Sequence, residues 1–353
     1  MSLEMAPSRM SSEPSALNPT KKHSLYILSD FHSKAVQHAH SLFHIVPHTS
    51  PEAKCWRQHA TAILIKDYAI TASDIYAAPQ LRVIGKQGVG VDQIDLEACE
   101  KAGVRVINTP GVNAGAVAEM TLALALSVSR SIPRIWCRMV KDGESVRKET
   151  VNGTLLGGKV VGVIGMGNIG QAVARVFHGG LNCGIVAYDP YLPWNTDGSG
   201  TNISTRGWDT IPHQRVERLE ELLEVSDVVS IHVPLTPSTK GLISYAQLEQ
   251  MKGTAILLNT ARGGIVDEDD LLRGLDQGLI WGAGFDCHVT EPPTKEKYER
   301  LWSQERYVGT PHIAAATDET QVATTNAAID GVWRFLNDTV IESVPLGAAG
   351  YVE

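Results

Sequence analysis

Residues 160–170 read VVGVIGMGNIG, and an amphipathic helical pattern follows over 169–177. The first five residues form a short apolar run of the kind that makes a buried strand. The next six have the G-x-G-x-x-G spacing of a strand-to-helix turn that binds a dinucleotide. In such a turn Gly165 permits the sharp bend, Gly167 lets the backbone approach a pyrophosphate, and Gly170 lets the helix pack against the strand. The phosphates would lie at the positive end of the helix. The predicted cofactor contacts in this turn are Gly165, Gly167, Asn168, Ile169 and Gly170.

A carboxylate stands at the end of the next apolar run. Asp189 lies 19 residues after Gly170 and directly follows the run Ile185–Tyr188. A carboxylate at this place accepts hydrogen bonds from both ribose hydroxyls of an adenosine and repels a 2′-phosphate. The alternative is a turn residue before Pro190. The spacing favours the cofactor role, and it favours NAD over NADP.

Short apolar runs alternate with helical patterns on both sides of this turn. Such alternation is typical of β-α-β units and a parallel sheet. A long apolar helical pattern over 114–131 separates the runs into two series, which predicts two doubly wound α/β lobes. The predicted strands are 25–28, 62–65, 81–84 and 104–107 in the first series, and 159–165, 183–189, 227–233, 253–259 and 280–286 in the second.

Three further features of the sequence allow structural predictions. Residues 195–215 are polar and rich in glycine, which predicts an exposed loop. Residues 317–337 have a helical pattern again. Met120, Leu122, Leu124 and Leu126 form an apolar stripe that we interpret as interdomain core, or partly as dimer surface.

Length and composition limit the class of protein. The chain has 353 residues, of which 43% are hydrophobic and 20% charged, as in ordinary soluble proteins of two domains. The net charge of −8 argues against a nucleic-acid partner, which would require a basic surface. No apolar run reaches 18 residues, so no membrane span is expected.

Cysteines and the N-terminus indicate the compartment. Five scattered cysteines with no C-x-x-C pair suit neither a disulfide framework nor a zinc ribbon, and they are typical of a reducing compartment. Residues 1–23 are rich in serine and proline and read as a flexible tail, not as a signal peptide. We therefore expect a cytoplasmic protein.

Histidines are concentrated near the N-terminus. His38, His40 and His44 could share one helical region, which raises the alternative of a metal site. Pro47 interrupts the pattern before His48, and no cysteine or carboxylate joins the set. A solvated helix is the better interpretation, so no metal is predicted.

Three ionisable residues follow later strands. Arg262, Glu291 and His312 should converge, because ligands of open α/β sheets bind at the carboxyl ends of the strands. Arginine can hold a carboxylate with two hydrogen bonds, and histidine exchanges protons near neutral pH. A neighbouring carboxylate raises the pKa of a histidine and orients its ring. Spacing alone leaves other interpretations open for each of them: a surface arginine, a helix-flanking glutamate and a structural histidine.

The order of motifs provides a further argument. The following motifs occur in this order: GKQGVGVDQID at 85–95, NTPG at 108–111, VAE at 117–119, the glycine turn at 165–170, HVPLTP at 232–237, NTARGGIVD at 259–267, DCHVTEP at 286–292 and TPHI at 310–313. With these motifs the chain resembles, from about Ser24 to Leu336, the D-isomer-specific 2-hydroxyacid dehydrogenase family, and in particular its phosphoglycerate dehydrogenase-like branch.

The resemblance implies a fold and an activity. A Rossmann NAD-binding domain at 113–312 would be inserted into a flavodoxin-like substrate domain made of residues 24–112 and 313–353. The expected reaction interconverts a D-2-hydroxy acid and its 2-oxo acid by hydride transfer with NAD. Relatives are commonly dimers through their dinucleotide lobes, so a homodimer is expected. No nucleic acid or membrane partner is expected.

The resemblance also implies roles for individual residues. Arg262 and the backbone of Gly88, Val89 and Gly90 would hold the substrate carboxylate. His312 would exchange the hydroxyl proton, and Glu291 would stabilise its protonated ring. The residues expected around the cofactor beyond the glycine turn and Asp189 are Val233 and Pro234 at the adenine, Thr260 and Ala261 at the nicotinamide, Asp286 at its carboxamide, and Ala315.

Lys86 departs from the family pattern and leaves the substrate open. Phosphoglycerate-type relatives commonly have arginine at this position, and lysine cannot grip a phosphate with a planar fork. Either Lys86 contacts a second anionic group of the substrate, or it is a solvated lysine at a strand end. The substrate is then 3-phosphoglycerate or another anionic hydroxy acid. The rival hypothesis is a non-catalytic NAD-sensing protein that resembles the corepressors of the same superfamily.

Overall fold

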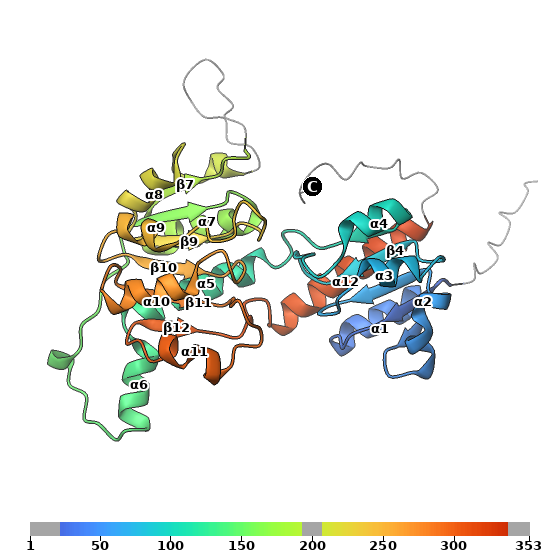
Figure 1. Ribbon diagram of the computed structural model, residues 1–353, viewed down its shortest axis with the longest axis horizontal. Helices are drawn as coiled ribbons and strands as arrows, with labels where there is room; N and C mark the ends of the chain where they lie inside the picture. The colour runs from blue at the N-terminus through green and yellow to red at the C-terminus, as the bar shows by residue number, and fades with distance from the viewer. Residues whose placement is uncertain (1–21, 193–206, 338–353) are drawn as a thin grey trace, which may run out of the picture.

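Two parallel β-sheets organise the computed structural model, which describes residues 22–192 and 207–337 (Figure 1). Most of the expected tail, residues 1–21, and the last part of the expected substrate domain, residues 338–353, lie outside the described residues. The first sheet has the strand order β2-β1-β3-β4-β5. Its strands are β1 (Ser24–Ile27), β2 (His44–Pro47), β3 (Ala62–Ile65), β4 (Val83–Lys86) and β5 (Arg105–Ile107).

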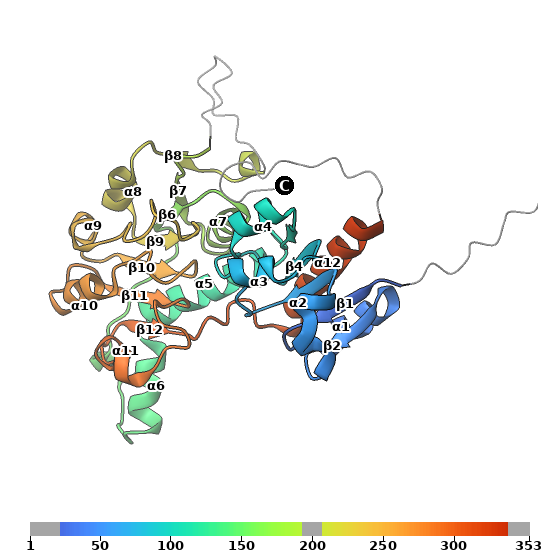
Figure 2. The same cartoon turned by 45° about the vertical axis from the view of Figure 1, so that its right-hand side comes forward.

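Helices cover both faces of the five-stranded sheet, which explains why its strands are continuous apolar runs rather than alternating ones. One face packs against α1 (Ser33–Leu42) and α12 (Asp318–Asn337), the second of which comes from the far end of the described chain (Figure 2). The other face packs against α2, α3 and α4. These helices span Trp56–His59, Ala72–Tyr76 and Leu96–Ala102, with a 3-10 turn at Pro51–Cys55.

The second sheet has seven parallel strands in the order β12-β11-β10-β9-β6-β7-β8. The order reverses direction at β6, which is the switch point where doubly wound sheets bind dinucleotides. The predicted fold class, with a Rossmann lobe inserted into a second parallel α/β lobe, is confirmed. The strands are β6 (Val160–Ile164), β7 (Gly184–Tyr188), β8 (Gln214–Arg215), β9 (Val228–Ile231), β10 (Ile256–Asn259), β11 (Gly282–Phe285) and β12 (Tyr307–Gly309).

Two helix layers enclose this sheet. α5 (Ala114–Ser129) and α7 (Asn168–Leu181) share one core with it. The second core lies under α8 (Leu219–Val225), α9 (Tyr245–Gln250), α10 (Glu268–Asp276) and α11 (Lys295–Trp302).

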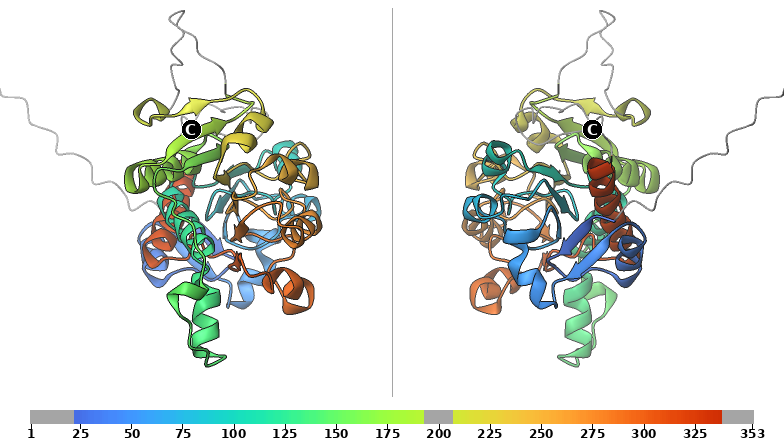
Figure 3. Two further views of the ribbon diagram at one scale, coloured as in Figure 1. Left: turned by 90° about the vertical axis from the view of Figure 1, so that its left-hand side faces the viewer. Right: turned by 90° about the vertical axis from the view of Figure 1, so that its right-hand side faces the viewer.

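The apolar stripe on α5 belongs to one lobe. Leu124 is buried in the core shared by α5, α7 and the seven-stranded sheet, and Met120, Leu122 and Leu126 pack against the same core. The interpretation as interdomain core was wrong, because α5 lies flat on this sheet. The helix ends at Ser129, and a separate helix, α6 (Ile132–Val140), projects from the lobe (Figure 3).

Two local predictions also need correction. Within the expected loop, residues 195–206 lie outside the described residues, but 207–215 are not an exposed loop. Trp208 opens a 3-10 turn (Trp208–Thr210), is fully buried, and donates its indole N–H to the carbonyl of Met166 at 2.7 Å. The predicted helical set of three histidines does not form, because His44 begins β2 while His38 and His40 lie on α1.

No single helix of the described residues has the length and apolar composition to cross a membrane. Only α5 and α6 taken together are long and apolar enough, and a bend of 61° separates these two helices.

Candidate active site

The glycine turn is shaped as the sequence predicts. Gly165 has φ +98°, a conformation that L side chains rarely adopt, and a Cβ atom there would lie 2.5 Å from the carbonyl oxygen of His232. A Cβ atom on Gly170 would collide with the carbonyl of Gly165. Gly167 is the N-cap of α7 and has no side chain to cap the first amides, which a helix leaves without intrahelical partners. This backbone cradle fits a pyrophosphate group, so the residues present fit a dinucleotide.

Asp189 is fixed beside that turn. It follows β7, and its carboxylate accepts hydrogen bonds from the amides of Met166 at 2.9 Å and Tyr191 at 3.0 Å. Val233 also reaches the turn, because its Cγ1 would lie 2.9 Å from a Cβ atom on Gly165. Pro234 is its exposed neighbour. The structure thus brings Asp189, the predicted ribose contact, and Val233, a predicted adenine contact, to the same glycine turn.

An asparagine that sequence reasoning missed shapes the next loop. The fully buried Asn259, at the end of β10, accepts a hydrogen bond from the amide of Ala261 at 3.1 Å and donates one to the carbonyl of Arg262 at 2.8 Å. Thr260 is held by a 3.0 Å hydroxyl contact with Thr121 of α5. Its position as the first residue of the NTARGG run, at the end of a predicted buried strand, was the available signal.

Arg262 connects the two lobes. Its Nε donates to Asp92 at 2.8 Å, and its Nη1 donates to the carbonyl of Ala261 at 2.7 Å. Its Nη2 lies so close to Gly90 that a Cβ atom there would collide with it. Burial lowers the pKa of Arg262, but the charge and hydrogen bond of Asp92 outweigh it and the net shift is upward. The guanidinium therefore stays charged where the first lobe meets the second.

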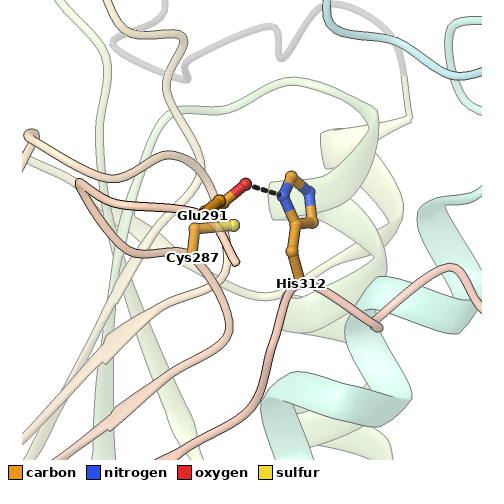
Figure 4. A group of neighbouring side chains, drawn as sticks. All are labelled: Cys287, Glu291 and His312. Atoms are coloured by element: carbon orange, nitrogen blue, oxygen red, sulfur yellow. Dashed lines mark hydrogen bonds and ion pairs between the residues drawn. The ribbon is translucent and has the colours of Figure 1, made fainter. Parts of the chain in front are cut away.

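His312 and Glu291 form a pair (Figure 4), and the charge of Glu291 also acts on Arg262. His312 Nδ1 lies 2.8 Å from a carboxylate oxygen of Glu291, whose other oxygen accepts the amide N–H of His288 at 3.1 Å. Hydrogen bonds to Cys287 and to Glu291 raise the pKa of His312 to about 10, against the effect of burial. Burial raises the pKa of Glu291, but the bond to His312 outweighs it and lowers the net value.

The backbone holds His312 in an unusual conformation. Its φ is +56°, in the left-handed region that non-glycine residues rarely adopt, and its amide donates to the carbonyl of Asp286 at 2.7 Å. Strained residues of this kind cluster at functional sites, where the surrounding structure has to hold them in place.

Asp286 supplies much of that support. Its carboxylate accepts hydrogen bonds from the Thr310 hydroxyl at 2.6 Å and from the amides of Ile313 at 2.9 Å and Ala314 at 2.8 Å. The side chain has no exposed surface. Asp286 thus anchors the segment that carries His312, and its expected contact with a nicotinamide carboxamide stays a prediction. Ala315, which comes next in that segment, is half-buried.

The first lobe presents the turn at 88–90 to the same site. Gly88 has φ +98° and donates its amide to Thr109 Oγ1 at 3.0 Å, while Asn108 donates to the carbonyl of Val89 at 2.7 Å. Lys86, at the end of β4, donates to the carbonyl of Gln87 at 2.9 Å. Burial lowers the pKa of Lys86, and among nearby charges Asp67 raises it while Arg262 lowers it further. Lys86 is thus a half-buried cation whose charge interacts with that of Arg262.

Two more neighbours of the site were not assigned from the sequence. Asp92 lies in the first motif and Cys287 in the DCHVTEP motif, but their contacts with Arg262 and His312 join distant parts of the chain. The fully buried Cys287 also donates its thiol to the carbonyl of Ala261 at 3.2 Å.

Comparison with known proteins supports the predicted family. Residues 122–314 match the model of the D-isomer specific 2-hydroxyacid dehydrogenase NAD binding domain. The hydroxypyruvate reductase of Thermotoga maritima is 40% identical over 71% of this chain and 76% of its own length. The D-3-phosphoglycerate dehydrogenase of Methanocaldococcus jannaschii is 37% identical over 78% of this chain, but the alignment covers only 49% of that longer protein.

A solved structure extends the similarity to both lobes. The crystal structure of the TT0316 protein from Thermus thermophilus superposes with a TM-score of 0.75 at 32% identity, over 89% of this chain and 96% of that chain. The fold and the sequence of the NAD-binding lobe therefore point to the same group of proteins. The chain belongs to the D-isomer specific 2-hydroxyacid dehydrogenase family, a family of NAD-dependent oxidoreductases that act on the CH–OH group of 2-hydroxy acids.

Proposed function

We propose that this chain interconverts a D-2-hydroxy acid with a second anionic group and the corresponding 2-oxo acid. Arg262 and the backbone amides of Gly88, Val89 and Gly90 hold the substrate carboxylate, and His312 exchanges the proton of the hydroxyl oxygen. NAD, when bound, accepts or donates the hydride. The protein supplies orientation and electrostatics for that transfer.

The position of Arg262 carries this proposal. Its guanidinium follows the end of β10 and touches Gly90 of the first lobe, and the negative charge of Glu291 also acts on it. A carboxylate held at this point contacts both lobes at once. Arginine provides two parallel hydrogen bonds to such a group, which fixes both its place and its orientation.

Glu291 supports the proton exchange by holding the imidazole ring of His312. Because Nδ1 faces Glu291 at 2.8 Å, Nε2 is the nitrogen that remains for the substrate oxygen. A carboxylate on one ring nitrogen sets the tautomer and stabilises the ring when it gains a proton at the other. The roles proposed for these two residues depend on each other.

The proposed cofactor contacts follow the glycine turn. The amides of residues 167–170 hold the pyrophosphate, Asp189 accepts the ribose hydroxyls, and Val233 and Pro234 flank the adenine. Thr260 and Ala261 line the nicotinamide end, together with Ala315. The support is the geometry of the turn and the orientation of Asp189 beside it.

We also propose the domain boundaries expected from the sequence, with residues 24–112 and 313–353 as the substrate domain and 113–312 as the NAD-binding domain. The packing of α12 on β4 and α1 supports the return of the chain to the first lobe. Gln87 adds a 3.2 Å hydrogen bond to Thr324 of α12. Movement at Asn113 and Ile313 would close the lobes on the substrate and exclude water.

Lys86 supports an anionic substrate such as 3-phosphoglycerate. The charges of Asp67, Asp92 and Arg262 all act on its ammonium group, which supports a second cation near the proposed carboxylate site. Two relatives act, by name, on hydroxypyruvate and on 3-phosphoglycerate, so both substrates belong in the test.

A panel of 2-oxo acids tests the activity and the role of Lys86. With NADH, we expect turnover to be fastest for acids with a phosphate or sulfonate group, and Lys86→Met to lower kcat/KM for these by about 10-fold or more, the loss of one charged hydrogen bond. Acids without the second anion should lose much less. Lys101→Met, which removes an exposed lysine, is the matched control.

Two results of the same 2-oxo-acid assay would contradict these proposals. An equal loss for all acids in Lys86→Met would refute a contact with the second anion. Tight NADH binding without turnover of any acid would refute the enzyme and favour the NAD-sensing, corepressor-like alternative.

We propose a homodimer that forms through α6. This helix has no buried residue, and Ile132, Trp136, Met139 and Val140 are each more than half exposed. Their spacing places them on one face of the helix. Exposed apolar stripes of this kind mark protein interfaces. A second copy of the chain is the partner expected from the family.

Charged side chains introduced on the exposed apolar face of α6 should dissociate the proposed dimer. We expect the Trp136→Glu/Met139→Lys double variant to elute as a monomer in size-exclusion chromatography with light scattering, while the unmodified chain elutes as a dimer. Tyr76→Glu, at another exposed apolar residue, should remain dimeric. A monomeric unmodified chain, or an unchanged dimer in the double variant, would overturn the assignment.

A further inference from the structure

Cys287, Glu291 and His312 form a cluster of potential metal ligands in the candidate active site. One sulfur, oxygen or nitrogen atom from each residue lies within 4.8 Å of the corresponding atoms of the other two (Figure 4). The cluster is the one group of at least three such side chains found among residues 22–192 and 207–337. The three residues come from the segments after β11 and after β12.

We propose that this cluster binds a zinc ion, and that the bound ion inhibits the enzyme. Cysteine sulfur, histidine nitrogen and carboxylate oxygen are the three ligand types that zinc uses in proteins. A site with three protein ligands leaves the fourth tetrahedral position to water or to another small ligand. The inhibitory part of the proposal rests on the proposed function of His312, whereas the binding part does not.

The distances suit a site that assembles by small side-chain movements. Bond lengths of about 2.0 Å to nitrogen or oxygen and about 2.3 Å to sulfur put the ligand atoms of a tetrahedral zinc site roughly 3.3–3.6 Å apart. The 2.8 Å contact between His312 and Glu291 has to open slightly, and the separations up to 4.8 Å have to close.

The exposure of the three side chains defines the route of entry. Cys287 is fully buried, whereas the side chains of His312 and Glu291 are 42% and 35% exposed. An ion therefore reaches the histidine and the carboxylate from solvent and meets the sulfur beneath them. The open fourth position then faces solvent.

Binding exchanges protons for the ion and involves no change of oxidation state. Zinc replaces the thiol proton that Cys287 now donates to the carbonyl of Ala261, and it replaces the proton shared by His312 and Glu291. Both protons leave to solvent. His312 can then no longer exchange a proton with the substrate, and Glu291 can no longer stabilise its charged ring.

The thiolate makes the site selective among metals. Sulfur ligands favour zinc and similar soft ions, whereas magnesium and calcium prefer sites made only of oxygen. We therefore expect zinc and cadmium to bind, and magnesium and calcium at the same concentration to have no effect.

Cobalt titration of the full chain tests the binding directly. Co²⁺ occupies zinc sites, and a cysteine ligand gives it a thiolate-to-metal charge-transfer band in the near ultraviolet. We expect this band, its loss on addition of Zn²⁺, and its absence in Cys287→Ala. Cys287→Ser, which conserves the volume of the side chain, should also lack the band and covers the case in which the alanine variant misfolds. Cys55→Ala and Cys137→Ala, at two cysteines outside the cluster, should keep it.

Inhibition provides the second readout. For 2-oxo-acid reduction, measured relative to each variant's own rate without metal, the Zn²⁺ concentration for half inhibition should rise about 10-fold or more in Cys287→Ala, as for the loss of a group that supports metal binding. It should stay the same in Cys137→Ala. An unchanged cobalt band or unchanged inhibition in Cys287→Ala would overturn the proposal. If no acid is turned over, the proposed function fails while the cobalt band still decides whether the metal site exists.

Discussion

Replacing His312 by Asn should lower kcat for 2-oxo-acid reduction by about 10²–10⁴-fold, the usual contribution of a positioned acid–base group. Asn keeps a polar side chain of similar size at a backbone position that needs φ +56°, and asparagine tolerates this region better than most residues. The fold should therefore survive. The Kd for NADH, measured by fluorescence, should not change, because His312 is proposed to contact the reacting oxygen and not the nucleotide.

Combination with Glu291→Gln shows whether the two residues act as a unit. If Glu291 acts only through His312, the His312→Asn/Glu291→Gln double variant should be no slower than His312→Asn alone. His48→Asn, at a partly exposed histidine paired with Asp30, is the control for a general effect of losing a histidine. Full additivity of the two losses would contradict the proposed pair.

Arg262→Ala should lower kcat/KM by about 10²–10⁴-fold. The variant loses two hydrogen bonds to the substrate carboxylate, each worth about 1.5–3 kcal/mol when one partner is charged. It also leaves Asp92 without its 2.8 Å partner, so part of the measured loss is the cost of that unpaired carboxylate. Steady-state kinetics with the fastest acid of the panel gives the value.

Two comparisons separate substrate binding from a general defect. Arg262→Lys should recover part of the loss, because lysine keeps the charge but cannot form two parallel hydrogen bonds. Arg273→Ala, which removes a half-exposed arginine of α10, should behave like the unmodified enzyme. If NADH affinity collapses in Arg262→Ala as far as kcat/KM does, Arg262 belongs to the cofactor site and the present assignment is wrong.

Local patterns were enough to predict most of the fold. Ala62–Ile65 appears as a strand with the predicted bounds, because a buried parallel strand is specified by a run of adjacent apolar residues. The glycine turn was equally clear, because Gly165 and Gly170 are needed by contacts within the same β-α unit.

What the sequence did not predict depends on contacts between distant residues. Asp92 meets Arg262 across 170 positions, so no local pattern shows the pair. Trp208 sits in a polar, glycine-rich segment, and only its burial near Met166 shows that the segment is packed. Asp286 accepts hydrogen bonds from the amides of Ile313 and Ala314, which lie 27 and 28 positions away, so its support of the His312 segment was not visible in the sequence.

The late return of the chain to the first lobe has a consequence for biosynthesis. Part of one face of the five-stranded sheet is covered by Ala328, Ile329 and Val332 of α12, which are translated about 220 residues after β5. At roughly 5–20 residues per second, this apolar face waits about 10–40 s on the ribosome for its cover. During that interval it is a surface that chaperones can bind and on which nascent chains can aggregate. The lobe whose strands emerge first is the last to be completed.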